Sequence, residues 1–527
     1  MLDLIIRGGL IADGTGQTAY HADIGVKDGK IARIEPEIAE KAAREINAQG
    51  LVVAPGFLDI HSHSDLMPIA EWLPESKLYQ GVTFELVGNC GGAPVPTIHD
   101  GAGTLSRYAA GKLGFPADGS FIGTETYARA AADHGHSTNY GTLVGHSNLR
   151  SCVVGLDNRD PSAAELAAMA ELLDRELTDG AFGMSLGLIY PPSAFAGTPE
   201  LDAMAKVVAK HDGVVSVHMR NEGKRVFEAL EEMIGVARRT GVHVEISHFK
   251  IMTKSLWGQS ARLLEMVDNA RAEGLRIDCD QYPYDASYTG LSALVPKWAH
   301  SGGREALLER VKNPEGTLAE ELLAELESRG GIHRVMIANT HGRYPEWEGL
   351  MIADMMEKFG MSALDTVREL LIRNEGSCSG IYFAQFEQDV ERILARPDIA
   401  VGSDGYNYSY DPDINKLTRP HPRSFATFPH ALELMRDKKL LPMEAAVRKM
   451  TGVPAATLGI TDRGILEAGK AADITIFDWN TVCQTGDYLN PYSRPRGIEK
   501  VIVAGQVIVE DGQITDARPG QILRHGR

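Results

Sequence analysis

Six residues of metal-ligand type each stand at or just beyond the end of a short apolar segment. They are His61, His63, Cys90, His218, His248 and Asp404. Imidazole, thiolate and carboxylate are the groups that bind zinc in proteins. Side chains alternate along a strand, so His61 and His63 point to the same side and can reach one ion. The set therefore predicts a zinc site, and zinc in such a site activates water for hydrolysis.

Each of these residues, taken alone, has a more ordinary explanation. A histidine at a strand end is more often a hydrogen-bonded structural residue, and an isolated buried cysteine is usually a small apolar group. An aspartate that precedes a glycine, as Asp404 does, is most often part of a turn. The repetition of such residues at matching positions favours one shared site. His146 closes a similar segment, but Ser147 and Asn148 do not extend a ligand pattern, so its role stays open.

The segments that precede these residues form a repeating strand–helix pattern. Eight short apolar segments lie at 56–61, 82–88, 141–146, 181–188, 213–218, 242–248, 275–282 and 398–404. Helical periodicity is clear between some of them, as in 161–177 and 222–240. The alternation predicts an α/β fold with parallel strands, and eight strands predict a closed (β/α)8 barrel. The C-terminal strand ends of such a barrel meet on one face, which would gather the six residues.

The two ends of the chain share a different pattern. Residues 2–16 predict two short strands around Gly8-Gly9, and 22–34 predict a hairpin; similar strands recur at 472–478 and 500–514. Such strands are too short to form a stable sheet alone, so we expect both ends to build one small β-sandwich.

The expected domain boundaries follow from these patterns. They are 1–54 for the N-terminal part of the sandwich, 55–464 for the barrel and 465–527 for its C-terminal part. The stretch of about 290–395 exceeds a simple crossover and contains its own helical pattern. We expect it to form an inserted lid, because long excursions over an active face are often functional.

The composition restricts the class of protein. A formal net charge of −18 disfavours a nucleic-acid partner, since phosphate binding needs a basic surface. The five scattered cysteines form no disulfide framework and indicate a reducing compartment. No secretory signal and no apolar run long enough to cross a membrane is found, which predicts a cytoplasmic protein without a membrane partner. The oligomeric state stays unknown.

Several motifs resemble one enzyme family. They are PGFLDIHSHSD at 55–65, Asn89-Cys90-Gly91, Gln281-Tyr282-Pro283-Tyr284, His421-Pro422-Arg423 and Thr427-Phe428-Pro429. Together they resemble the N-acyl-D-amino-acid deacylases (D-aminoacylases) of the amidohydrolase superfamily. Most two-metal amidohydrolases use a carboxylated lysine as bridge, whereas this family uses a cysteine. The resemblance runs from Leu2 to about Gly512.

The resemblance implies a metal arrangement and roles for further residues. It implies one tightly held zinc on Cys90, His218 and His248, and a second, weaker position on His61, His63 and Asp404, with Cys90 able to bridge. Asp404 would be the general base and later the general acid. Tyr190 would lie beside the scissile carbonyl, and the substrate α-carboxylate would be bound by Lys250, Tyr282 and Arg423.

Purely structural roles remain possible explanations for these further residues. Arg423 could form a surface ion pair, Lys250 could be a solvated loop charge, and the two tyrosines could pack at the barrel rim. Tyr288 departs from the family pattern and could narrow the pocket. An acidic substrate side chain would need an additional cation nearby, and residues 286–298 contain only Lys297. This scarcity of cations favours substrates with neutral or apolar side chains.

The implied activity is zinc-dependent hydrolysis of N-acyl-D-amino acids, small molecules with a free carboxylate. Two alternatives stay open. One is another amidohydrolase that acts on a cyclic amide, such as a hydantoin or dihydroorotate, or on a D-dipeptide. The other is a non-catalytic scaffold, which the presence of every expected ligand disfavours.

Overall fold

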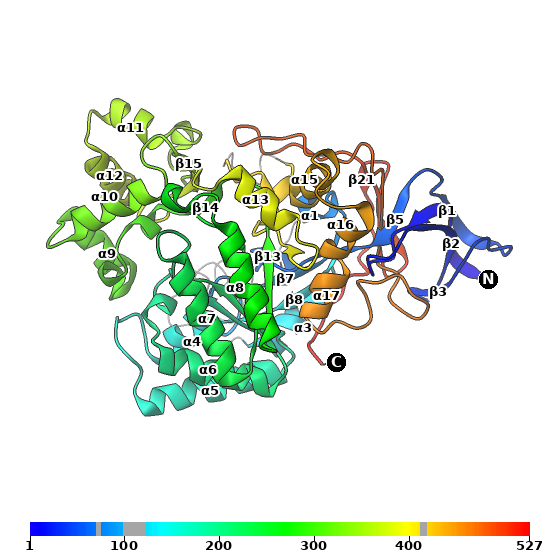
Figure 1. The fold of residues 1–527 in the computed structure, drawn as a ribbon, viewed down its shortest axis with the longest axis horizontal. Coiled ribbons are helices and arrows are strands. Elements are labelled where there is room, and N and C mark those ends of the chain that lie inside the picture. The colour runs from blue at the N-terminus through cyan, green and yellow to red at the C-terminus, as the bar shows by residue number, and fades with distance from the viewer. Residues whose placement is uncertain (70–74, 98–122, 412–418, 527) are drawn as a thin grey trace.

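A computed structural model describes residues 1–69, 75–97, 123–411 and 419–526 (Figure 1). Each of the eight predicted segments contains a strand that pairs in parallel with its neighbours. The strands are β6 (Phe57–Asp59), β7 (Val82–Val87), β8 (Asn139–Thr142) with β9 (Val144–Gly145), β10 (Gly183–Gly187), β11 (Val214–His218), β12 (His243–Ile246), β13 (Ile277–Gln281) and β17 (Ala400–Val401). They form two parallel sheets, one in the order β6-β7-β8 and the other in the order β17-β13-β12-β11-β10-β9.

These strands are covered by helices, so their sequences are apolar rather than alternating. Every residue of β7, β10 and β11 is buried, as expected for parallel strands with both faces covered. The second sheet packs against α5 (Ala163–Thr178), α6 (Thr198–Lys210), α7 (Val226–Thr240) and α8 (Ser260–Ala272) in one hydrophobic core. The start of α5 is fixed by a capping box of Ser162 and Glu165.

Backbone hydrogen bonds link the two parallel sheets at both ends of their strand orders. The amide of Leu143 donates to the carbonyl of Val87 (2.9 Å), within the segment that joins β8 to β9. At the other end, the amide of Asp404 donates to the carbonyl of His61 (2.7 Å), and the amide of His63 donates to that of Gly405 (2.9 Å). The chain beyond β17 therefore lies beside the chain beyond β6.

Strands from both ends of the chain share one nine-stranded sheet, on the right in Figure 1. Its strands are β1 (Leu2–Ile11), β2 (Tyr20–Lys27), β3 (Lys30–Glu35), β4 (Ala42–Asn47), β5 (Val52–Pro55), β18 (Ile474–Phe477), β19 (Ile498–Val503), β20 (Gln506–Glu510) and β21 (Gln513–Ile514). Antiparallel pairing of β5 with β18 joins the two ends. The prediction of two strands around Gly8-Gly9 was wrong, because β1 is one strand whose register shifts between Ile6 and Gly9.

The stretch after β13 forms a separate unit with its own hydrophobic core, at the upper left of Figure 1. It contains β14 (Ser287–Gly290), α9 (Gly303–Lys312), α10 (Leu318–Ser328), β15 (Val335–Asn339), α11 (Ile352–Phe359), α12 (Ala363–Arg373) and β16 (Ser379–Tyr382). Its three strands form an antiparallel sheet in the order β14-β16-β15. We refer to residues 287–382 as the insertion.

The remaining helices lie around the parallel strands. They are α1 (Glu75–Leu78), α3 (Thr124–His134), α4 (His146–Val153), α13 (Glu387–Leu394), α15 (Arg423–Asp437), α16 (Met443–Met450) and α17 (Gly452–Thr457). Among the residues that the structure describes, no helix has the length and apolar character needed to span a lipid bilayer.

Candidate metal centre

The structure brings all six sequence-predicted ligands together in two groups that share Cys90. The groups are His61, His63, Cys90 and Asp404, and Cys90, His218 and His248. In each group the potential ligand atoms lie within 4.8 Å of one another. Cys90 Sγ lies 3.4 Å from Nε2 of His61, 3.7 Å from Nδ1 of His218 and 3.5 Å from Nε2 of His248. The thiol of Cys90 is thus the centre of the cluster.

Three residues of the cluster have an unusual backbone conformation. The φ angles of Cys90, His248 and Asp404 are 55°, 39° and 49°. Residues other than glycine rarely adopt positive φ, since the Cβ atom crowds the backbone there. Such conformations cost free energy and gather at functional sites, where surrounding structure holds them in place. All three residues stand just beyond strand ends, and their side chains converge on the cluster.

A glycine on the neighbouring strand makes room for Cys90. A Cβ atom built on Gly187, the last residue of β10, would lie 2.0 Å from the carbonyl oxygen of Cys90. Any larger residue at this position must displace the Cys90 backbone. Gly187 is therefore a requirement of the cluster that residue type alone does not reveal.

The electrostatics of the cluster favour ionised ligands. Burial by itself raises the pKa of the Cys90 thiol, but the facing imidazoles of His61 and His248 hold that pKa well below its usual value. Burial likewise opposes ionisation of Asp404, yet the Arg423 guanidinium and the His248 imidazole hold the pKa of this carboxyl well below its usual range. A thiolate and a carboxylate are the forms that bind metal ions.

Two acidic residues that sequence reasoning missed contact the imidazoles from behind. Asp280 Oδ2 lies 2.9 Å from Nδ1 of His61. The carboxylate of Glu222 lies 3.3 Å from Nε2 of His218 and 3.0 Å from Nδ1 of His248. Asp280 lies on β13 and Glu222 on the loop after β11, and neither stands in a pattern that marks it out in the sequence.

The cluster opens into a cavity of about 420 Å³, here called the inner cavity. Of the predicted substrate contacts, Tyr190, Lys250, Tyr288 and Arg423 line it. The hydroxyl of Tyr190 lies 2.9 Å from Oγ1 of Thr289. Burial raises the pKa of Tyr190 well above its usual value, so this hydroxyl keeps its proton and can donate a hydrogen bond.

Tyr282 does not line the inner cavity, although it was predicted to contact the substrate. It is buried, and its ring lies under the Arg423 guanidinium, with 5.0 Å between the guanidinium carbon and the ring centroid. Its hydroxyl accepts a hydrogen bond from Gln385 (3.2 Å). The structure thus places Tyr282 as a support for Arg423.

Arg423 and Lys250 are not the solvated charges of the ordinary explanation. Nη1 of Arg423 lies 2.7 Å from Oδ2 of Asp404, and Lys250 donates to Glu222 and to the carbonyl of His248 (3.0 Å). Both cations are buried. Each cation of this pair therefore already has an acidic partner within the protein.

The role of His146 is left open by the sequence. Both ring nitrogens of His146 are occupied, by Ser193 (2.8 Å) and Glu200 (2.9 Å), which places this histidine outside the metal cluster. Tyr406 lines the inner cavity, whereas Tyr408 packs against Phe425, as does Tyr410. Part of the loop between Asp404 and Arg423 lies outside the described residues.

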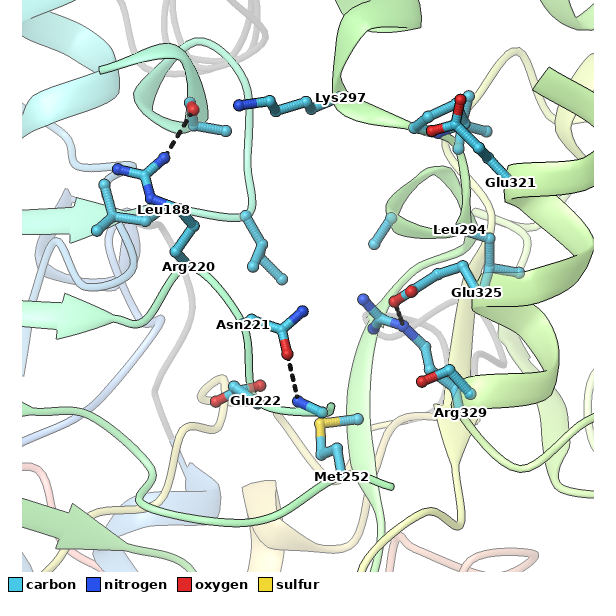
Figure 2. A pocket seen from close by; sticks show the side chains of 17 residues that line it. Leu188, Arg220, Asn221, Glu222, Met252, Leu294, Lys297, Glu321, Glu325 and Arg329 are labelled. Atoms are coloured by element: carbon cyan, nitrogen blue, oxygen red, sulfur yellow. Dashed lines mark hydrogen bonds and ion pairs between the residues drawn. The ribbon is translucent and has the colours of Figure 1, made fainter. Parts of the chain in front are cut away.

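A second pocket of about 220 Å³, here called the outer pocket, adjoins the inner cavity (Figure 2). Both are lined by Ile189, Glu222, Met252 and Arg329. Figure 2 shows its two walls: Arg220, Asn221 and Glu222 come from the loop after β11, and Glu321, Glu325 and Arg329 come from the insertion.

Arg329 is a cation that sequence reasoning missed. It lies outside residues 286–298, where Lys297 is the only cation. Its guanidinium pairs with Glu325 (2.7 Å) and lies over the Tyr382 ring. It therefore adds little net charge to the pocket.

The donor set fits zinc. A thiolate, imidazoles and a carboxylate combine the ligands of known zinc sites. His61, His218 and His248 also have a carboxylate beside the nitrogen that faces away from Cys90, as metal-bound histidines do.

A model of the amidohydrolase family matches residues 44–371 and 404–509. The chain belongs to this family. It is 35% identical over 526 residues to an N-acyl-D-glutamate deacylase of Alcaligenes xylosoxydans xylosoxydans, covering 99% of this chain and 96% of the relative. A D-aminoacylase of the same organism is 33% identical over 99% of this chain and 97% of its own length.

A solved structure is similar over the same extent. The N-acyl-D-glutamate deacylase of Bordetella bronchiseptica, complexed with zinc and a phosphonate mimic of the tetrahedral intermediate, superposes with a TM-score of 0.84. It is 34% identical and covers 99% of both chains. The resemblance stated from the sequence motifs is thereby confirmed, and the protein is a metal-dependent hydrolase of the α/β class.

Proposed function

We propose that this protein hydrolyses the amide bond of N-acyl-D-amino acids to a carboxylate and a free D-amino acid. The observation that carries the proposal is the convergence of Cys90 with His218, His248 and Asp404 at the floor of a cavity that also holds Arg423. Relatives with deacylase activity support the substrate class, since they match nearly the whole chain.

The metal is proposed to be zinc, held tightly by Cys90, His218 and His248. A second, weaker position would use His61, His63 and Asp404. Zinc bound there would lower the pKa of a water molecule and polarise a carbonyl oxygen. Two overlapping ligand groups support two positions, although one ion alone satisfies the proposed chemistry.

The protein's own residues supply proton transfer and orientation. Asp404 accepts a proton from the attacking water at Oδ1 or Oδ2. It later donates this proton to the departing nitrogen, because an amide anion is too poor a leaving group. The Tyr190 hydroxyl donates a hydrogen bond to the developing oxyanion. Arg423, supported by Tyr282, offers a planar fork to the substrate α-carboxylate, and Lys250 adds a point charge.

The inner cavity and the outer pocket suggest where the rest of the substrate lies. Tyr288 narrows the inner cavity, and the outer pocket offers room for one further arm of the substrate. That pocket combines apolar residues, such as Leu294 and Met252, with charged residues at its edge.

The same proposal includes the finer architecture. The links from Leu143 to Val87 and from Asp404 to His61 support closure of the two parallel sheets into one eight-stranded barrel. The insertion would act as a lid because it forms one wall of the outer pocket. The proposal also includes domain boundaries near residues 54 and 465. The strands from the two ends of the chain would form a β-sandwich.

The experiment is a comparison of N-acetyl-D-methionine, its L-enantiomer and a hydantoin on protein of measured zinc content. We expect turnover of the D-enantiomer alone, with at least one zinc per chain. Cys90→Ala serves as the matched inactive protein and should lose both metal and turnover. Equal hydrolysis of both enantiomers, or preferential opening of the hydantoin, would contradict the proposed substrate class.

A further inference from the structure

We infer that Glu222 is the positioning residue of the metal centre: its one carboxylate fixes the proton position of both histidines that share the Cys90 zinc. The inference rests on the metal site of the proposed function. It is independent of which amide the enzyme cleaves, because it concerns how the empty protein prepares the ligands.

The two histidines face the thiol and the carboxylate with opposite ring nitrogens. Cys90 Sγ lies beside Nδ1 of His218 (3.7 Å) and Nε2 of His248 (3.5 Å). On the far side, Glu222 Oε2 lies 3.3 Å from Nε2 of His218, and Oε1 lies 3.0 Å from Nδ1 of His248. His218 thus faces the metal position with Nδ1 and His248 with Nε2. The other nitrogen of each ring lies beside the carboxylate of Glu222.

This arrangement matters because a neutral imidazole carries one N–H. A ring nitrogen that binds a metal must be free of its proton, so the proton must occupy the other nitrogen. For His218 that means Nδ1 bare and Nε2 protonated, and for His248 the reverse. A carboxylate beside both far nitrogens stabilises this combination in both rings at once. Partners of this kind typically change metal affinity about 10- to 100-fold.

No competing partner satisfies these nitrogens. Among the described residues, neither Nε2 of His218 nor Nδ1 of His248 has a hydrogen bond to any other group. The contacts with Glu222 are close approaches rather than aligned hydrogen bonds. Loss of this carboxylate would remove the negative charge that lies beside both buried nitrogens and favours an N–H on each.

The surrounding chain holds Glu222 in place. It is 8% exposed and lies on the loop between β11 and α7. Asn221 Oδ1 accepts hydrogen bonds from the amides of Gly223 (3.0 Å) and Arg225 (2.9 Å), and the amide of Met252 donates to the Glu222 carbonyl (2.7 Å). Figure 2 shows Glu222 and the bond of Asn221 to the neighbouring backbone. These hydrogen bonds fix the backbone from which the Glu222 side chain extends toward both histidines.

Lys250 is the third partner of the same carboxylate. It donates to Oε1, and two carboxylate oxygens have enough lone pairs to accept three donors. The positive charge of Lys250 balances the charge that Glu222 brings into the cavity. Glu222 thereby links the metal ligands to a proposed α-carboxylate contact without touching the reacting atoms.

The test compares zinc affinity in Glu222→Gln and in a matched control, measured without substrate by chelator competition. The glutamine side chain accepts hydrogen bonds only at its oxygen atom. Its NH2 group must therefore face an imidazole N–H or the Lys250 ammonium, both of which are also donors. We expect about 10- to 100-fold weaker zinc binding in Glu222→Gln. We also expect a changed visible spectrum after cobalt substitution. The melting temperature of the metal-free protein should fall no further than in the control.

The control is Glu200→Gln. Glu200 is also buried between a histidine, His146 (2.9 Å), and an arginine, Arg150, but His146 is not in the cluster. We expect Glu200→Gln to lower the melting temperature and to bind zinc with wild-type affinity.

Wild-type zinc affinity in folded Glu222→Gln would overturn the inference, as would equal zinc loss in both variants. Should Glu222→Gln fail to fold, Glu222→Asp takes its place. Its shorter carboxylate can reach one imidazole at most, so weaker zinc binding is again expected. Unchanged affinity in that variant would be equally decisive against the inference.

Discussion

Arg423 Nη1 lies 2.7 Å from Oδ2 of Asp404, so the proposed anchor of the substrate carboxylate is also the partner of the proposed base. A guanidinium has five N–H donors in a rigid fork, which allows it to hold one carboxylate and still bind another. Both side chains are almost completely buried. In the proposed mechanism, Arg423 thus serves both substrate recognition and proton transfer, and substitution there should affect both.

Arg423→Ala is expected to act most strongly on substrates with a free α-carboxylate. Removing a charge-assisted hydrogen bond costs about 1.5–3 kcal/mol, or roughly 10- to 150-fold in kcat/KM. A methyl ester of the same N-acyl-D-amino acid lacks the carboxylate and should show only the smaller loss caused by the unpaired Asp404. Steady-state kinetics on both compounds measure the difference. Equal penalties would mean that Arg423 serves Asp404 alone.

Asp404→Asn separates metal binding from proton transfer. An amide cannot accept and return the proton, so kcat should fall by about 10²- to 10⁴-fold. The Cys90–His218–His248 group does not include Asp404, so at least one zinc per chain should remain by elemental analysis. Asp278→Asn is a control, because Asp278 pairs with His243 away from the cluster. A near-normal kcat in Asp404→Asn would remove this residue from the proposed mechanism.

Gly187→Ala tests the packing beneath the thiol. The added Cβ would stand 2.0 Å from the carbonyl oxygen of Cys90, so the Cys90 loop must move. We expect reduced zinc content and at least a tenfold loss of turnover, since small displacements of reacting groups are costly. Gly197→Ala is the control, because its nearest atom would lie 3.7 Å away. Full zinc content and activity in Gly187→Ala would show that the Cys90 backbone can move without loss of metal binding or turnover.

The ligand types and the strand pattern could be predicted from the sequence because each depends on local residues. Apolar segments that end in polar residues predict strand ends, and the parallel arrangement gathers those ends. The sequence therefore predicts that His61, Cys90 and His248 are neighbours.

The residues that tune the site could not be predicted in this way. Glu222 and Asp280 act through contacts that only the folded chain creates, and their own segments carry no ligand pattern. Tyr282 belongs to a recognisable motif, yet its ring supports Arg423 instead of lining the inner cavity. The continuous strand β1 was misjudged because two glycines resemble a turn, whereas here they accompany a shift of register.

Lys449 offers a test of stability that is separate from the metal centre. Burial lowers the pKa of its ammonium from 10.5 to about 7. The folded state therefore binds the proton less tightly than the unfolded chain does. The resulting loss of stability is complete below about pH 7 and declines as the pH rises from there toward the unfolded value.

Replacing this lysine should consequently help most at low pH. We expect Lys449→Met to raise the melting temperature relative to the wild type at about pH 6, and this advantage to shrink by a few degrees at about pH 9. The lost hydrogen bond from Lys449 to the carbonyl of Arg396 lowers stability at both pH values. Lys438→Met, at a lysine paired with Glu387 and Glu391 on the surface, should show no such trend. Melting curves at one scan rate measure the effect, and a pH-independent difference would mean that Lys449 does not titrate in this range.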